Sequence, residues 1–266
     1  METTYWQKQG SEPLFPDLLW SRPERRSAAG KLLIVGGNVH AFAAPAEAFA
    51  EAQQAGIGTV RVVLPDATKK LVGKLLEHLE YAPSTPSGSF GQKSLAELLD
   101  LAAWSDGVLM AGDIGRNSET AIVLEKFATK YPGHLTLTKD AADYAVSSPE
   151  IIINRQDTLL VLSFAQLQKL ASKAGFTSAF TFDMDILRFV STLHEFTQTY
   201  APHIIVKHHN QMHCAVNGAV VSTKLTEDTD IWRVKTAAHA SVWWLQAPTK
   251  PLEAFATSTV SSISQA

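Results

Sequence analysis

The segment that decides the fold is residues 31–65, which read KLLIVGGNVHAFAAPAEAFAEAQQAGIGTVRVVLP. Residues 31–35 form a short apolar run with branched side chains, and Gly36-Gly37 ends it abruptly, which predicts a buried strand. The stretch 46–55 is rich in alanine and glutamate and predicts a helix. A second apolar strand is expected over 59–64. Strand, helix and strand in so short a segment make a βαβ unit, whose two strands lie parallel with a right-handed crossover.

The same alternation continues along the chain and predicts an α/β protein with a mostly parallel central sheet and helices on both faces. Asn217-Gly218 lies between two apolar runs and predicts a β-hairpin. Asp183 is expected to cap the helix that follows it. Beyond residue 65, helices are expected over 69–79, 94–103, 119–130, 165–174, 184–199, 231–246 and 252–263; strands are expected over 107–110, 135–137, 151–153, 159–162 and 203–207, with hairpin strands over 212–216 and 219–221.

The first 30 residues are polar and interrupted by proline, so they are interpreted as an N-terminal arm, with one domain over 31–266. The arm has no core of its own. It is expected to pack on the domain through its apolar side chains: Leu14, Phe15, Leu18, Leu19 and Trp20.

Composition and charge exclude several classes of function. The chain of 266 residues carries 23 Lys plus Arg and 26 Asp plus Glu, a net charge of -3. This balance provides no overall basic field, so neither nucleic acid nor a membrane is expected as a partner. The single cysteine, Cys214, excludes an internal disulfide and a cysteine-based zinc site. No signal peptide or membrane span is recognised, so a cytoplasmic protein is expected.

Two glycine-bearing turns are the candidate ligand-binding loops. Gly36-Gly37-Asn38 follows one strand, and 111–116, which reads AGDIGR, follows another. Such turns either serve only to reverse the chain or expose backbone N–H groups toward a phosphate or carboxylate. Because the carboxyl ends of parallel strands form one edge, both turns are expected in one crevice, with Arg116 available to pair with a phosphate.

Other polar groups have a structural and a functional interpretation. Asp140 and Asp143 follow a strand and could hold a ligand or Mg²⁺, although Asp140 equally well caps the next turn. Trp243-Trp244 is expected in the core or at a subunit contact, so a homo-oligomer is one option. Four histidines, His203, His208, His209 and His213, are interpreted as strand-end residues and not as a metal site, because adjacent strand residues point to opposite faces.

The segment LIVGGN at 33–38, followed by Ala43-Ala44-Pro45 and by AGIG at 55–58, resembles the first substrate loop and helix of the NAD(P)H-hydrate dehydratase family. The resemblance extends over residues 30 to 262. It implies a ribokinase-like three-layer α/β/α sandwich. It also implies an enzyme that uses ATP or ADP with Mg²⁺ to phosphorylate and dehydrate hydrated NADH or NADPH.

Further segments carry the resemblance. Residues 106–110 with 114–116 are similar to the family's glycine-rich loop, of which Gly115 and Arg116 are kept; 138–142 is similar to its Asp-Ala-Asp-Ala segment. In 161–167, Ser163 stands at the position of the family's histidine, and 204–207 resembles the strand before the nucleotide loop. The implied substrate-binding residues are Gly36, Gly37, Asn38, Ala44, Gly115, Arg116 and Ser163, and the implied nucleotide-binding residues are Lys207, His208, His209, Asn210 and Gln211.

One motif departs from the family. Where the family has Gly-Gly-Thr-Gly-Asp at a helix start, residues 231–236 read IWRVKT, without glycine or aspartate. Lys235 then stands near the position of the aspartate base. Side chains there obstruct the approach of a phosphate to the backbone, and a lysine acts as a base only when burial lowers its pKa far. Asp228 and Asp230 are the alternative carboxylates nearby.

Three hypotheses therefore remain: a divergent nucleotide-dependent dehydratase or kinase, a nucleotide- or dinucleotide-binding sensor or regulatory protein without turnover, and an unrelated α/β protein with similar glycine loops. The residue that reaches the base position distinguishes the first two. Strand order, and whether the last two helices close over Gly36-Gly37, distinguish the third.

Overall fold

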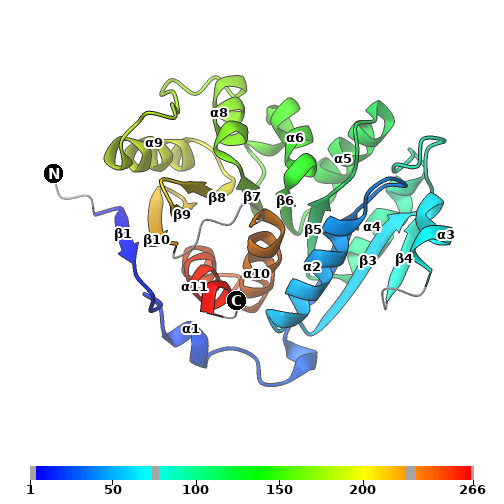
Figure 1. Cartoon of the computed structure of the whole chain (residues 1–266), viewed down its shortest axis with the longest axis horizontal. Coiled ribbons are helices and arrows are strands. Elements are labelled where there is room, and N and C mark those ends of the chain that lie inside the picture. The colour runs from blue at the N-terminus through cyan, green and yellow to red at the C-terminus, as the bar shows by residue number, and fades with distance from the viewer. Residues whose placement is uncertain (1–3, 74–77, 226–231, 265–266) are drawn as a thin grey trace.

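The computed structural model describes residues 4–73, 78–225 and 232–264. A single ten-stranded sheet crosses this part of the chain in the order β1-β10-β9-β8-β7-β6-β5-β2-β3-β4 (Figure 1). All neighbours from β4 to β8 are parallel, and β9 is antiparallel to β8 and β10. The strands are β1 (Trp6–Gln9), β2 (Lys31–Gly36), β3 (Thr59–Pro65), β4 (Leu79–Ala82), β5 (Gly107–Gly112), β6 (His134–Thr138), β7 (Thr158–Leu162), β8 (His203–His208), β9 (Gln211–Val216) and β10 (Ala219–Lys224).

Helices cover both faces of the sheet. One layer holds α2 (Ala43–Gln54), α10 (Arg233–Gln246) and α11 (Pro251–Ser264), which lie together in front of the sheet in Figure 1. The other layer holds α4 (Ser94–Trp104), α5 (Ser118–Lys130), α6 (Lys139–Ser147), α8 (Phe164–Lys173) and α9 (Ile186–Thr199). Shorter helices are α1 (Asp17–Trp20), α3 (Lys69–Val72) and α7 (Pro149–Ile152), with single 3₁₀ turns at Arg26–Ala28 and Asp66–Thr68. The predicted three-layer architecture is confirmed.

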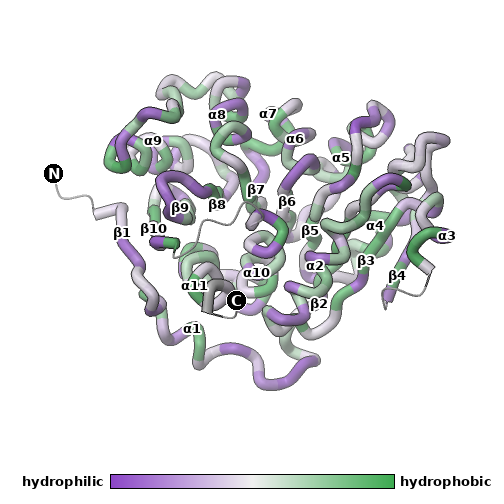
Figure 2. The backbone as a smooth tube through the Cα atoms, viewed as in Figure 1, coloured by the Kyte–Doolittle hydropathy of each residue, from purple (hydrophilic) through white to green (hydrophobic). Residues whose placement is uncertain are grey.

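Successive side chains of each strand point to opposite faces of the sheet and so contribute to two separate hydrophobic cores. In β2, Leu33 and Val35 join the core beneath α4 and α5, whereas Leu32 and Ile34 join the core beneath α2 and α10. In Figure 2 the central strands β5 and β7 are mostly hydrophobic, whereas the edge strand β1 is mostly hydrophilic. A strand covered on both faces is apolar throughout, which explains why β2 appears in the sequence as a continuous run and not as an alternating one.

The order of the strands creates a switch point. From β2 the chain proceeds outward to β3 and β4, and β5 then returns to the other side of β2, with β6 and β7 beyond it. In open α/β sheets the crevice at such a reversal, outside the carboxyl ends of the strands, is where ligands bind. Here those ends are Gly36 and Gly112, the two predicted glycine turns.

Several local predictions were wrong. The strand expected over 151–153 is helix α7, whose first residue is Pro149, a favourable position for proline. The helix expected over 69–79 ends at Val72, and strand β4 begins at Leu79. Strand β1, helix α6 and the 208–211 hairpin were not predicted. Asp228, Asp230 and Ile231 lie outside the described residues.

The N-terminal arm contributes to the fold through an unexpected element. Trp6 to Gln9 form β1, which pairs in parallel with β10 at the edge of the sheet. Leu18 is buried as expected, but Trp20 is 88% exposed and does not pack. The division into an arm and one domain stays a prediction.

The N-cap of α9 supports a stability prediction. The Asp185 carboxylate accepts the Arg188 backbone N–H at 2.9 Å, so Asp185, and not Asp183, caps this helix. We expect Asp185→Ala to lower the free energy of unfolding by about 1 kcal/mol. Asp183→Ala, two residues earlier, is the matched control and should cost less than half as much in urea denaturation. Equal losses from the two variants would contradict the assignment of the cap.

Candidate functional site at the switch point

The two glycine turns lie side by side at the carboxyl ends of β2 and β5. The Gly37 N–H donates to the Gly112 carbonyl at 2.9 Å, and Gly36 is paired with Gly112 across the strands. A Cβ atom on Gly36 would lie 2.6 Å from the Gly112 carbonyl oxygen. Glycine is therefore required here by close packing of the two backbones.

Asn38 and Gly115 extend this contact into the loops. The Asn38 side-chain amide donates to the backbone carbonyl of Asp113 at 2.6 Å, and Asn38 is buried. Tyr144 of α6 donates its hydroxyl to the Gly115 carbonyl and accepts from the Asn117 N–H, which holds the second loop on α6. Arg116 lies exposed beside this loop. The structure thus brings Gly36, Gly37, Asn38 and Gly115 together.

Ala44, the remaining residue of the predicted first loop, contacts a carboxylate. Its backbone N–H, in the first turn of α2, donates to Asp113 Oδ2 at 2.7 Å. Lys139 Nζ, at the start of α6, lies 2.7 Å from Asp113 Oδ1. The Asp113 side chain is only 12% exposed. A carboxylate of the chain itself therefore occupies the N-terminal end of α2, where a helix attracts anions.

Asp140, next to Lys139, secures the second loop. Its Oδ2 accepts the Gly115 backbone N–H at 3.0 Å, whereas its Oδ1 is buried without a hydrogen-bond partner. Burial raises the pKa of Asp140, the Gly115 hydrogen bond lowers it, and the charge of Asp113 raises it. The side chain thus fixes a loop, and Thr138, the N-cap residue of α6, makes no side-chain cap hydrogen bond.

Ser163 is the N-cap residue of α8 and takes part in its capping box. The Gln166 N–H donates to Ser163 Oγ, and Gln166 Oε1 accepts the Ser163 N–H in return. The Gln166 amide also donates to the Lys139 carbonyl and to Asp143, both at 2.8 Å. Arg233, the first residue of α10, donates to Gln166 Oε1 at 3.1 Å. Gln166, which sequence reasoning missed, therefore joins α6, α8 and α10.

Helix α10 begins with cations. Arg233 and Lys235 lie in its first turn, which contains no acidic residue. Glu51 of α2 contacts His239 of α10 at 2.9 Å. One turn nearer the crevice, Glu47 of α2 lies within electrostatic range of Lys235. The described residues that reach this position thus include a lysine from α10 and a glutamate from α2.

Glu47 has a perturbed pKa. Burial is the largest cause and raises the pKa, and the negative charge of Glu51 raises it further. Lys139 and Lys235 lower it, and Asp113 raises it. These same charges show that Glu47, Asp113, Lys139 and Lys235 share one electrostatic environment. The sequence signal for Glu47 was only its place in an alanine-rich helix.

The predicted nucleotide loop is a tight hairpin. His209 and Asn210 both have positive φ, 46° and 55°, and connect β8 to β9 in a two-residue turn. His209 Nε2 lies 2.9 Å from the Met184 carbonyl oxygen. Lys207 and Gln211 flank the turn as half-buried strand residues. A side chain at each turn position replaces the open glycine backbone that the resemblance implies.

Aromatic rings surround this hairpin. His208 stacks on Phe164 with ring centroids 4.4 Å apart, and Phe189 lies 4.7 Å away. Burial lowers the pKa of His208 to about 4. Phe182, whose ring centroid is 4.4 Å from that of Phe164, is 63% exposed and forms the outer end of the stack.

Mg²⁺ is the ion that the resemblance implies, and the described side chains fit it poorly. Mg²⁺ is usually held by one or two carboxylates together with phosphate oxygens. Both Asp113 oxygens already accept donors, and one oxygen of Asp140 does so. Within 4–73, 78–225 and 232–264, no group of three or more His, Cys, Asp or Glu side chains could hold a metal.

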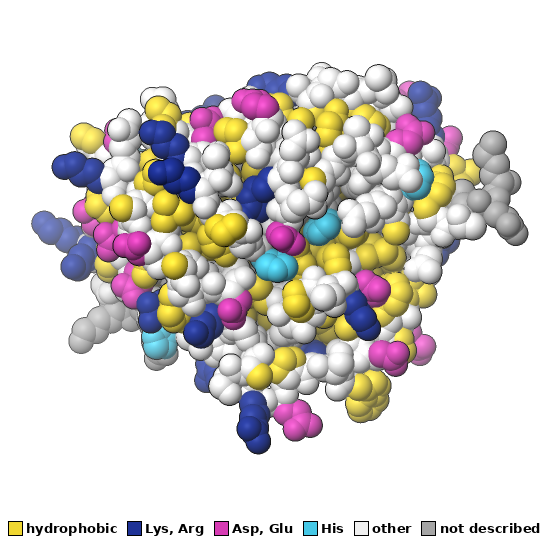
Figure 3. Space-filling model, turned by 180° about the vertical axis from the view of Figure 1, so that it is seen from behind, with side chains coloured by type: hydrophobic (Ala, Val, Ile, Leu, Met, Phe, Trp, Pro, Cys, Tyr) yellow, Lys and Arg dark blue, Asp and Glu magenta, His cyan; other side chains and the backbone are white. Residues whose placement is uncertain are grey.

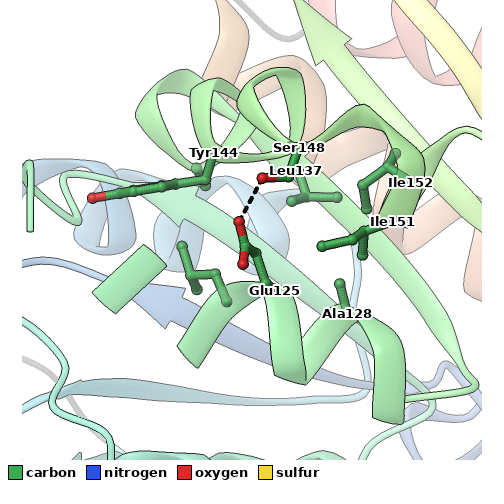
Figure 4. A pocket seen from close by; sticks show the side chains of 10 residues that line it. Glu125, Ala128, Leu137, Tyr144, Ser148, Ile151 and Ile152 are labelled. Atoms are coloured by element: carbon green, nitrogen blue, oxygen red, sulfur yellow. Dashed lines mark hydrogen bonds between the residues drawn. The ribbon is translucent and has the colours of Figure 1, made fainter. Parts of the chain in front are cut away.

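A cavity behind the second loop is too small for a nucleotide. It lies beneath α6 and measures about 20 Å³, enough for about one water molecule. Figure 4 shows Tyr144 of α6 and Ser148, which follows this helix, above Glu125 and Ala128 of α5, with Ser148 hydrogen-bonded to Glu125. The cavity therefore belongs to the packing that supports the loop.

On the face shown in Figure 3, Lys and Arg side chains are interspersed with Asp and Glu. Within the described part of the chain, no helix has both the length and the hydropathy needed to cross a bilayer. Trp243 and Trp244 are 2% and 1% exposed, so they are core residues of the chain and not available to a partner.

The chain was compared with protein families and with curated proteins. No family model matches the chain. Over 104 residues, 37% of this chain, the sequence is 35% identical to a bifunctional NAD(P)H-hydrate repair enzyme of Methanothermobacter thermautotrophicus. The chain spans only 20% of the length of that curated relative.

Solved structures match nearly the whole chain. A ribokinase-like superfamily protein from Enterococcus faecalis V583 has a TM-score of 0.72 at 13% identity, covering 98% of this chain and 88% of the other. An ADP/ATP-dependent NAD(P)H-hydrate dehydratase from Bacillus subtilis, co-crystallised with ATP and Mg²⁺ and soaked with CoA, has a TM-score of 0.63 at 12% identity, covering 95% and 87%. The unrelated α/β alternative is therefore rejected: the chain has the ribokinase-like fold, and its resemblance to the NAD(P)H-hydrate dehydratase family is confirmed.

Proposed function

We propose that this chain is a divergent relative of the NAD(P)H-hydrate dehydratases that binds an adenine nucleotide or dinucleotide without dehydrating hydrated NAD(P)H. The first turn of α10 carries the proposal. Arg233 and Lys235 stand there, and this turn contains no carboxylate. Cations attract phosphate, whereas the family's chemistry requires a base at this helix start.

Lys235 is a poor replacement for that base. A lysine removes a proton only when it is itself neutral, which requires strong burial or neighbouring positive charge. Lys235 is only half-buried and lies within electrostatic range of the Glu47 carboxyl. Its role in the proposal is therefore to bind an anion.

The proposed ligand positions follow the crevice. Phosphate groups would lie between the start of α10 and the start of α2, near Lys235 and Lys139, which both act electrostatically on Glu47. The base would lie at the hairpin formed by 207–211, where the exposed Phe182 ring continues an aromatic stack. Stacking of a nucleobase on an aromatic side chain contributes about 1–3 kcal/mol. A second ligand would lie against Gly36, Gly37 and Ala44.

A binding and turnover experiment tests the proposal. Thermal unfolding is measured with ATP, ADP, NADPH and hydrated NADPH, and loss of the hydrate is followed with ATP or ADP and Mg²⁺. An adenine nucleotide at about 100 times its Kd should stabilise the fold by about 2.7 kcal/mol and raise Tm by about 5 °C or more. The hydrate should disappear no faster than without protein.

Matched variants locate the binding. Lys235→Met should remove most of the nucleotide-induced increase in Tm. Lys126→Met, which removes the same charge from the exposed face of α5, should retain it. No stabilisation by any nucleotide, or equal behaviour of the two variants, would refute the proposed binding.

A second candidate function is dehydration or phosphoryl transfer with Glu47 as the acid–base group. The observation in its favour is the raised pKa of a half-buried carboxyl at the crevice, a common property of catalytic groups. The turnover assay above separates the two candidates: nucleotide-dependent loss of the hydrate, abolished by Glu47→Gln, would establish this enzyme and refute the binding protein.

A further inference from the structure

We propose that the Asp113 carboxylate is a built-in competitor for the anionic group of the ligand and keeps the anion position of the switch-point crevice closed until the ligand displaces it. The inference rests on the proposed function, because it names how the same crevice is regulated. The ligand group concerned is a phosphate or a carboxylate. Because the ligand must first displace the Asp113 carboxylate, it would bind more weakly than it would to the same donors in an empty site.

The donors around Asp113 are those of an anion site. Ala44 contributes a first-turn N–H at 2.7 Å, and Lys139 contributes an ammonium group at 2.7 Å, one to each oxygen of the carboxylate. The N-terminal end of a helix together with a lysine is a common arrangement for binding phosphate oxygens. The three groups come from α2, the β5 loop and α6, so the arrangement exists only in the folded chain.

The backbone of Asp113 is held independently of its side chain. The Asn38 amide donates to the Asp113 carbonyl at 2.6 Å, and the Gly112 carbonyl before it accepts the Gly37 N–H at 2.9 Å. Opening the site therefore requires rotation of one side chain and not movement of the loop. Rotation breaks two charge-assisted contacts, which a ligand anion can re-form with the same donors.

Competition from Asp113 makes the apparent affinity for the ligand equal to the intrinsic affinity multiplied by the fraction of molecules in which Asp113 has rotated away. With two short contacts holding the carboxylate, the closed form predominates, and removing the carboxylate should strengthen anion binding. Asp113 has φ of 56°, in the left-handed region. Glycine accepts this conformation without strain and asparagine tolerates it, whereas alanine does not.

The test compares Asp113→Gly and Asp113→Asn with the wild-type chain, using inorganic pyrophosphate and ADP as probes in isothermal titration calorimetry. Asp113→Gly should bind pyrophosphate at least about tenfold more tightly, and Asp113→Asn should lie between it and the wild type. Lys139→Met in the Asp113→Gly background should abolish the gain. Asp143→Asn is the charge control: it removes a neighbouring carboxylate that contacts neither donor, and should leave the affinity nearly unchanged.

The outcomes separate this inference from the proposed function. If ADP binds the wild-type chain and Asp113→Gly with equal affinity, the competitor is refuted and the proposed function stands. If Asp143→Asn increases the affinity as much as Asp113→Gly does, the effect arises from overall charge, and the competitor is also refuted. If Asp113→Gly binds pyrophosphate tightly while no form binds ADP, the nucleotide proposal fails and the competitor stands. Should Asp113→Gly fail to fold, an unchanged affinity of Asp113→Asn refutes the inference.

Discussion

Gly112→Ala is expected to lower the free energy of unfolding by about 4 kcal/mol, the sum of a strained backbone and a steric clash. Gly112 has φ of 105°, which side chains rarely adopt. An added Cβ atom would lie 2.7 Å from Lys139 Cβ and 2.9 Å from Asp140 Oδ1. Neither neighbour can move easily, because Lys139 is paired with Asp113 and Asp140 holds Gly115.

Gly175→Ala separates the two causes. Gly175 also has positive φ, 72°, but an added Cβ would meet nothing within 4 Å. Gly175→Ala should therefore lower the free energy of unfolding by only about 1 kcal/mol, which is the cost of the strained backbone alone. Both variants are measured by urea denaturation. If Gly112→Ala were no worse than Gly175→Ala, the close packing assigned to the switch-point crevice would be incorrect.

The second large effect is a loss of stability in mild acid. Burial lowers the pKa of His203 to about 4 and that of His213 to about 3. His213 is hydrogen-bonded to Ser222 and to the His208 carbonyl, and His203 lies against Trp244 and Phe255. Among the described residues, no carboxylate is hydrogen-bonded to either ring, and Asp157 raises the pKa of His203 less than burial lowers it.

The direction of this pH dependence follows from where the unfolded and folded chains bind protons. The unfolded chain takes up a proton at each histidine near pH 6.5, whereas the folded chain does so only near pH 4 or below. Stability is therefore complete above the unfolded pKa and falls as the pH decreases from there toward the folded pKa. When the pH falls from about 7.5 to about 5, each histidine should lower the free energy of unfolding by about 2 kcal/mol.

Urea denaturation at these two pH values measures the loss. His203→Phe should reduce the difference by about 2 kcal/mol, because phenylalanine does not titrate. His40→Phe, a substitution at an exposed site, is the control and should leave it unchanged. A pH dependence that is the same in His203→Phe and the wild type would contradict the buried neutral state of His203.

Local patterns predicted the elements that local chemistry determines. The apolar run in β2, the glycine break after it and the alanine-rich α2 sufficed for the first βαβ unit. Helix α7 was missed because its apolar residues Ile151 and Ile152 resemble a strand, whereas Pro149 and Glu150 favour a helix start. Strand β1 was missed because half of it is exposed at an edge, and its pairing with β10 joins residues far apart in the chain.

The functional crevice was predicted only in part, for the same reason. Glycines mark a turn wherever they occur, so Gly36, Gly37 and Gly115 were visible in the sequence. Asp113, Lys139, Gln166 and Glu47 were not, because their roles depend on contacts between separate elements. The histidine-containing hairpin was hidden because His209 and Asn210 adopt positive φ without a glycine to signal it.

The order of residues alone established the α/β architecture and the glycine turns, since each is a property of neighbouring positions and their periodicity. The departure near Lys235 is visible only by comparison with the family that the sequence resembles. Tertiary packing decided that a carboxylate would fill the α2 end of the crevice. Asp113 meets Ala44 and Lys139 only because β2, β5 and β6 are neighbours in the sheet, and contacts between adjacent strand ends leave no pattern in any one stretch of chain.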